Sequence, residues 1–212
     1  ASRYALRDTV LMRMGKTEFD ALLQSRPPLM LTIIRALAKR MRVGSRRSTD
    51  RGLGQHFTVV PTPGVDSSAI AKRLVAALSA LGPTMLLDPA TIHAEGVMEN
   101  AATMPNDHPA WLRFGAWLDQ ADGRVQYIVF DAGQGNNAWS RRCVRQADHV
   151  LLVAHRDSSP LPEEVESALL PDDGGRRATR TLALLHPDGS RPPSGTRRWL
   201  DTRRVDGHVH VK

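Results

Sequence analysis

The sequence predicts a doubly wound α/β domain with a mainly parallel sheet over residues 57–205. Five short apolar runs in this region alternate with amphipathic segments of helical periodicity. Runs rich in Val, Ile and Leu throughout are typical of parallel strands that helices cover on both faces. We therefore expect strands at Phe57–Val60, Thr84–Leu87, Val125–Phe130, Val150–Ala154 and Thr181–Leu185.

Helices are expected between these strands, and the first of them has the clearest limits. Residues 67–81 carry apolar side chains on one stripe at helical spacing. Asp66 or Ser67 is available as the N-cap, and a Gly-Pro pair follows as the stop signal. We expect one or two further helices between Ala90 and Gln120, and one each at Ala138–Ala147 and Leu161–Leu170.

A smaller unit precedes this domain. Residues 5–14 alternate enough to predict a strand, a short helix begins at Thr17, and a longer helix ends near Val43. Residues 44–56 contain three glycines and two serines with almost no apolar residue, which indicates a linker. We thus divide the chain into a strand-and-two-helix unit at 1–43, a basic linker at 44–56, the α/β domain at 57–205 and a tail at 206–212.

Charge and composition limit the classes of protein to which the chain can belong. No apolar run approaches the roughly 18 residues that cross a bilayer. The first 14 residues scatter arginines among the apolar positions, unlike a signal peptide. The single cysteine, Cys143, excludes a disulfide within the chain and fits a reducing compartment. We therefore expect a cytoplasmic protein, either free or peripheral at a membrane.

Basic residues, which give the chain a formal net charge of +7, gather in residues 39–51 and again in residues 176–204. Residues 39–51 contain no aromatic side chain on which a base could stack. A solvated linker is therefore the favoured interpretation, and nucleic acid is not an expected partner. A basic module that binds nucleic acid or anionic lipid through residues 39–51 stays open as an alternative.

The turn after the first strand, Pro61–Ser68, is where a doubly wound domain would bind a ligand phosphate. It contains one glycine, two prolines that lack an N–H donor, one carboxylate and no lysine. We expect at most a weak anion site at Gly64, Ser67 and Ser68, and no cofactor.

Other chemical signals in the sequence are weak. Asp131 ends the third strand where a P-loop enzyme would hold magnesium, but without a phosphate cradle we expect a capping role. No serine lies in a G-x-S-x-G elbow, and the Asp-Gly-Gly at residues 173–175 is interpreted as a charged surface turn. His208 and His210 would share one strand face, but no third ligand lies near them in the sequence. We predict no catalytic residue and no metal ligand.

Two stretches of the sequence resemble parts of a known family. Residues 5–9 (Ala-Leu-Arg-Asp-Thr), a following Phe-x-x-Leu-Leu helix and residues 37–41 are similar to the end of a cyclic-nucleotide-binding domain. The second stretch runs from Phe57 to His210, and its most specific piece is Arg-Cys-x-Arg-Gln-Ala-Asp within residues 139–153. Together they resemble the segment between the cyclic-nucleotide-binding domain and the patatin hydrolase domain of neuropathy-target-esterase-like phospholipases.

The resemblance implies that both active parts of such a protein lie outside this sequence. The residues that hold the cyclic nucleotide would precede Ala1, so residues 1–43 would be a truncated remnant of that domain. The oxyanion loop, the serine elbow and the catalytic Asp-Gly-Gly would follow Lys212. The α/β segment also resembles a degenerate P-loop domain of the partitioning-ATPase type, whose signature lysines are absent from this sequence.

We therefore expect a non-catalytic regulatory or connecting module of a patatin-like lysophospholipase, whose parent would hydrolyse phospholipid acyl esters. The main alternative is a switch domain of degenerate P-loop type that responds to a nucleotide or another phosphate ligand. The expected partner is the patatin hydrolase domain of the parent chain. An anionic membrane surface and self-association through the apolar stripe of residues 29–41 are further candidates.

Overall fold

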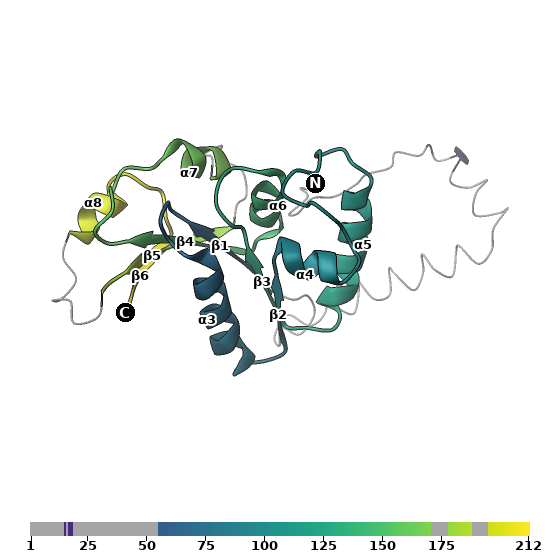
Figure 1. Cartoon of the computed structure of the whole chain (residues 1–212), viewed down its shortest axis with the longest axis horizontal. Coiled ribbons are helices and arrows are strands. Elements are labelled where there is room, and N and C mark those ends of the chain that lie inside the picture. Colours follow the sequence, from purple (N-terminus) through teal and green to yellow (C-terminus); the bar gives the residue numbers. More distant parts are fainter. Residues whose placement is uncertain (1–14, 16, 19–54, 171–177, 188–194) are drawn as a thin grey trace. The chain divides into compact units, whose positions relative to one another are not determined.

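The computed structural model describes residues 15, 17–18, 55–170, 178–187 and 195–212 (Figure 1). The strand and helices expected within residues 5–43, and the expected linker up to residue 54, lie outside the described residues apart from residues 15, 17 and 18. The chain divides into two units, one of Asp8–Leu53 and one that includes Gly54–Lys212. The α/β domain belongs to the second unit.

Six parallel strands form one sheet in the order β2-β3-β1-β4-β5-β6. β1 lies at the centre between β3 and β4, and the chain builds outward from it first on one side and then on the other. The predicted α/β class is therefore confirmed. The strands are β1 (Gln55–Pro61), β2 (Thr84–Leu87), β3 (Tyr127–Asp131), β4 (His149–His155), β5 (Thr179–Leu185) and β6 (Gly207–Val211).

Helices cover the two faces of the sheet unequally (Figure 1). On one face, α3 (Ser67–Ser79) packs Ala71 into a cluster with Val59 and Val129. On the other face, the other described helices pack around large buried side chains such as Phe114 and Trp139. Burying a side chain of that size stabilises the fold by about 1.5–3 kcal/mol. These helices are α4 (Pro89–Ala94), α5 (Ala110–Asp122), α6 (Ala138–Gln146), α7 (Glu164–Leu169) and α8 (Thr196–Leu200).

The central strand begins earlier than the sequence analysis expected. β1 starts at Gln55, so Gln55 and His56, which we assigned to the linker, belong to the sheet. The His56 side chain is fully buried, although a histidine after a glycine-rich segment gives no local sign of burial. Residues far along the chain form hydrogen bonds with its polar atoms, and these bonds allow a polar side chain to be buried in the domain.

Two elements, α8 and β6, were not predicted. β6 occupies residues assigned to a tail, and it pairs with β5 from Thr181↔Gly207 to Leu185↔Val211. An edge strand has one neighbour and needs fewer apolar residues than a central strand, which is why its histidine-rich pattern gave a weak signal. α8 is a single short turn whose buried side chain is Trp199. The domain therefore extends through β6, past the predicted boundary at residue 205.

His56 joins several elements at the N-terminal edge of the sheet. Its Nε2 lies 2.5 Å from Oδ1 of Asp122 at the end of α5, and its Nδ1 lies 3.0 Å from the Gln146 carbonyl oxygen at the end of α6. Its backbone N–H donates to Oδ2 of Asp148 at 2.9 Å, and its carbonyl accepts the Asp148 N–H at 2.9 Å. Each ring nitrogen therefore has an oxygen that can accept a hydrogen bond within reach.

We expect His56→Ala to lower the free energy of unfolding by about 3–5 kcal/mol, because it removes a buried imidazole from the Asp122 carboxylate and from a carbonyl. Urea unfolding of the 212-residue chain, followed by circular dichroism, measures the change. His155→Ala is the matched control, because that side chain is exposed and should change stability little. Equal effects of the two substitutions would contradict a structural role for the buried ring.

Candidate functional site

The loop after β1 has little free backbone with which to bind a phosphate. Pro61 and Pro63 lack an N–H group. The Thr62 N–H donates to the Val153 carbonyl at 2.8 Å, and the Val65 N–H donates to the Thr62 carbonyl at 3.2 Å. A phosphate cradle needs several N–H groups that converge on one point, and these loop positions supply none of them.

The Asp66 carboxylate occupies the N-terminus of α3, where an anion would otherwise bind. Its Oδ1 accepts the Ala69 N–H at 3.1 Å, in an ordinary N-cap arrangement. The predicted anion-site residues surround this cap: Gly64 is exposed with a φ of +83°, Ser67 is buried and Ser68 is half-buried. A visiting phosphate would meet the Asp66 charge, and anion binding at this site stays a prediction.

Asp131 ends β3 as predicted and caps a local turn. Its Oδ1 accepts the Gly133 N–H at 2.9 Å, and its carbonyl accepts Nε1–H of Trp139 at 2.7 Å. Burial, and next to it the charge of Asp131, raises the pKa of the Cys143 thiol well above its ordinary value. A thiol with a raised pKa stays protonated at neutral pH and is a poor nucleophile.

The Arg-Cys-x-Arg-Gln-Ala-Asp segment at residues 142–148 packs against the sheet. Cys143 is fully buried, and its carbonyl accepts the Thr58 hydroxyl at 2.9 Å. The Arg142 guanidinium lies over the Trp111 ring, 4.6 Å from the ring centroid. The last residues of the segment bind the buried histidine of β1. The segment therefore joins α6 to β1 and β4.

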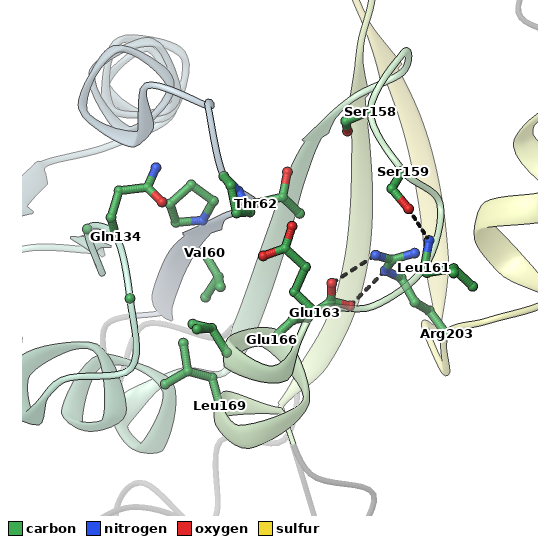
Figure 2. A pocket seen from close by; sticks show the side chains of 15 residues that line it. Val60, Thr62, Gln134, Ser158, Ser159, Leu161, Glu163, Glu166, Leu169 and Arg203 are labelled. Atoms are coloured by element: carbon green, nitrogen blue, oxygen red, sulfur yellow. Dashed lines mark hydrogen bonds and ion pairs between the residues drawn. The ribbon is translucent and has the colours of Figure 1, made fainter.

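A cavity opens at the C-terminal ends of the central strands, with about 610 Å³ of space that includes its open mouth (Figure 2). The chain leaves β1 toward one face of the sheet and leaves β3 and β4 toward the other, and such divergence creates a crevice in doubly wound domains. Loop residues after these three strands line the cavity, together with α7 and Arg203. The Thr62 hydroxyl is buried in this lining and has no hydrogen-bond partner among the described residues.

Arg203 and Glu166 form a bidentate ion pair beside the cavity (Figure 2). Nε lies 2.7 Å from Oε1 and Nη2 lies 2.8 Å from Oε2, and the Arg203 side chain is 3% exposed. Nη1 donates to the Pro160 carbonyl, and the guanidinium lies over the Trp199 ring at 4.6 Å. These contacts occupy the arginine, which therefore does not present a binding group for an anion.

A histidine cluster lies at the end of β5 and on β6. His186 Nε2 lies 2.7 Å from His210 Nδ1, and the Thr196 hydroxyl lies 3.3 Å from His210 Nε2. The ring of His208, whose centroid is 5.7 Å from that of His210, is the third member. Among the residues that the structure describes, no three metal-binding side chains are arranged to hold an ion. The sequence showed the pair on β6, but His186 joins it only through the pairing of β5 with β6.

Burial lowers the pKa of His210, and the nearby His186, His208 and Arg156 lower it further. Each of these neighbours disfavours a second positive charge beside it. The hydrogen bond between His186 and His210 also needs one ring nitrogen without a proton. The surroundings of His210 therefore favour its neutral form.

Several predicted features lie outside the described residues. They are the Asp-Gly-Gly at 173–175, the basic segment at 39–51 and the apolar stripe at 29–41. In the part of the chain that is described, no helix combines the length and apolar character needed to cross a membrane.

The α/β domain matches a family model described as the Neuropathy Target Esterase family P-loop like domain, over residues 55–212. The chain is 27% identical, over 98% of its length, to patatin-like phospholipase domain-containing protein 7 of Rattus norvegicus. It is also 27% identical, over its full length, to lysophospholipase nte1 of Aspergillus terreus. The chain spans 16% of the length of the rat protein and 15% of the length of the fungal one.

Among solved structures, a plasmid partition protein from Borrelia burgdorferi is similar, with a TM-score of 0.48 and 12% sequence identity. The similarity covers 75% of this chain and 91% of the partition protein.

We expect Asp66→Ala to lower the free energy of unfolding by about 1 kcal/mol, because the Ala69 N–H loses its acceptor at the start of α3. Chemical unfolding of the purified chain measures the change. Ser68→Ala is the control, because it alters a neighbouring side chain without removing the cap. A change below the error of the measurement for Asp66→Ala would show that the carboxylate does not hold the helix start.

The lowered pKa of His210 predicts that stability falls in mild acid. In the unfolded chain this imidazole keeps its ordinary pKa of 6.5, so below that pH the unfolded state binds more protons than the folded state. The contribution is fully present above pH 6.5 and is lost as the pH falls through the lowered pKa of the folded state. His210→Gln should flatten the pH dependence of the midpoint of thermal unfolding, and exposed His155→Gln should leave it unchanged. Parallel pH profiles for all three proteins would contradict this prediction.

Proposed function

The chain belongs to the Neuropathy Target Esterase family, and we propose that it is a non-catalytic connecting and regulatory module of a patatin-like lysophospholipase. Its relatives carry the names of such enzymes, and the chain matches a small share of their length. The observation that carries the proposal is the loop after β1, in which Asp66 caps α3 and prolines remove N–H donors. A P-loop-like domain with this loop lacks the usual means of using a nucleotide.

The other candidate groups support the same proposal, because each has a packing role. Asp131 caps a turn, Cys143 is buried with a raised pKa, and Arg203 is held by Glu166. Acyl transfer would then take place in the hydrolase domain of the parent, which is the proposed partner of this module. The net charge of +7 favours an anionic membrane surface as a further partner.

A nucleotide- or phosphate-responsive switch is the second candidate function. It is favoured by the P-loop-like fold and by Gly64, which is exposed at positive φ beside the start of α3. Titration of the chain with ATP by calorimetry separates the two candidates. Saturable binding with a Kd below roughly 10 μM, abolished by Gly64→Ala or Ser67→Ala, would favour the switch over the connecting module.

Purified alone, the chain should not hydrolyse p-nitrophenyl butyrate or a lysophospholipid, because the proposed nucleophile, base and oxyanion hole belong to the parent's hydrolase domain. Release of nitrophenol and of fatty acid measures the reaction, with the full-length parent enzyme as positive control. Turnover that survives repurification and disappears in a single serine-to-alanine variant of this chain would overturn the proposal.

The regulatory part of the proposal needs the parent enzyme. Replacing residues 55–212 in the parent by a flexible linker should change kcat or KM for lysophospholipid while the hydrolase domain stays folded. Kinetic constants that match those of the intact enzyme would overturn a regulatory role.

A further inference from the structure

The cavity at the C-terminal ends of the central strands keeps a space that suits an organic ligand. Its space of about 610 Å³ includes the open mouth of the cavity, so part of a bound ligand would stay in contact with solvent. Val60 and Leu169 are buried in its lining, whereas Leu161 and Val165 line it and are still 64% and 39% exposed. Aliphatic side chains exposed at a concave surface favour an apolar group over a bare ion.

The charge of the cavity is negative. Its charged lining residues are Glu163, Glu166 and Arg203. Glu166 and Arg203 neutralise each other through two hydrogen bonds. The Glu163 carboxylate, at the start of α7, has no hydrogen bond or ion pair with any of the described residues. One uncompensated carboxylate therefore faces the ligand space, and it repels a phosphate and attracts a cation.

Hydrogen-bond acceptors accompany this charge. Thr62 is 8% exposed, and its hydroxyl lacks a partner in the described part of the chain. The Gln134 side-chain nitrogen donates to the Val65 carbonyl at 2.8 Å, which leaves the amide oxygen as an acceptor. Figure 2 shows Thr62, Gln134 and Glu163 around the same space. A primary ammonium has three N–H donors and no acceptor, which matches this set.

We propose that the cavity binds an aliphatic primary ammonium compound. The ammonium group donates to the Glu163 carboxylate and to the Thr62 hydroxyl, and the aliphatic chain lies on Val60, Leu161 and Val165. The buried hydroxyl thereby gains the partner that it lacks, and the exposed aliphatic side chains lose contact with water. The site is independent of the proposed connecting role, because it requires neither a hydrolase domain nor a nucleotide.

The test uses the 212-residue chain and three probes with the same alkyl group: hexylamine, 1-hexanol and hexyl phosphate. Binding at pH 7 is followed by amide chemical shifts in NMR titrations. Hexylamine, which is protonated at this pH, should bind saturably with a Kd near roughly 1 mM, and hexyl phosphate should bind more weakly than hexanol. Glu163→Gln should weaken hexylamine binding by roughly tenfold.

Glu164→Gln is the matched control, because this neighbouring acid is also exposed but does not line the cavity. It should leave the Kd for hexylamine unchanged, and shifts on titration should centre on Thr62, Gln134 and Val165. Equal weakening by the two substitutions would show only a general charge effect and would overturn the site. Tighter binding of hexyl phosphate, or the absence of saturation with hexylamine, would also overturn it.

Discussion

The buried contacts of His56 hold the N-terminal edge of the sheet together, and the rest of the domain depends on that edge. The ring joins the ends of α5 and α6, and the backbone joins β1 to the residue before β4. An imidazole removed from water is costly unless its nitrogens are bonded. The central position of β1 therefore depends on Asp122 and Gln146, which bond the two ring nitrogens of His56. Its neighbours then pair in one register, with Gln55 opposite Tyr127 and Phe57 opposite His149.

The two ends of the parallel strands differ in chemistry. At the N-terminal ends of the strands, the polar groups around His56 are hydrogen-bonded to it. At the C-terminal ends lies the crevice that doubly wound folds place beside their central strand. Asp66 provides at the start of α3 the negative charge that a ligand phosphate would otherwise bring. Glu163 adds a second carboxylate, which lies in the lining of the crevice. The fold thus keeps a ligand space, with the Glu163 carboxylate in its lining and the Asp66 carboxylate at the nearby start of α3.

The segment by which the sequence most resembles its family has a structural role. In Arg-Cys-x-Arg-Gln-Ala-Asp, the cysteine is buried, the first arginine stacks on Trp111 and the end of the segment bonds to His56. These groups pack within the domain, so the segment is a signature of its structure and not of a catalytic site. The candidate ligand groups of Thr62, Gln134 and Glu163 come instead from three separate connections.

The sequence by itself determined the α/β class and the strands β1 to β5, because apolar runs and helical stripes are patterns of neighbouring residues. The start of α3 at Asp66 was also readable from the sequence, since a capping carboxylate acts locally. Only the tertiary structure decided which polar residues are buried and which partners they bond. His56 meets Asp122 across 66 positions and His186 meets His210 across 24. The cavity likewise lies between loops that crossovers bring together. A polar group can be buried when it has hydrogen-bond partners. In this fold, the order and register of the strands bring those partners to it.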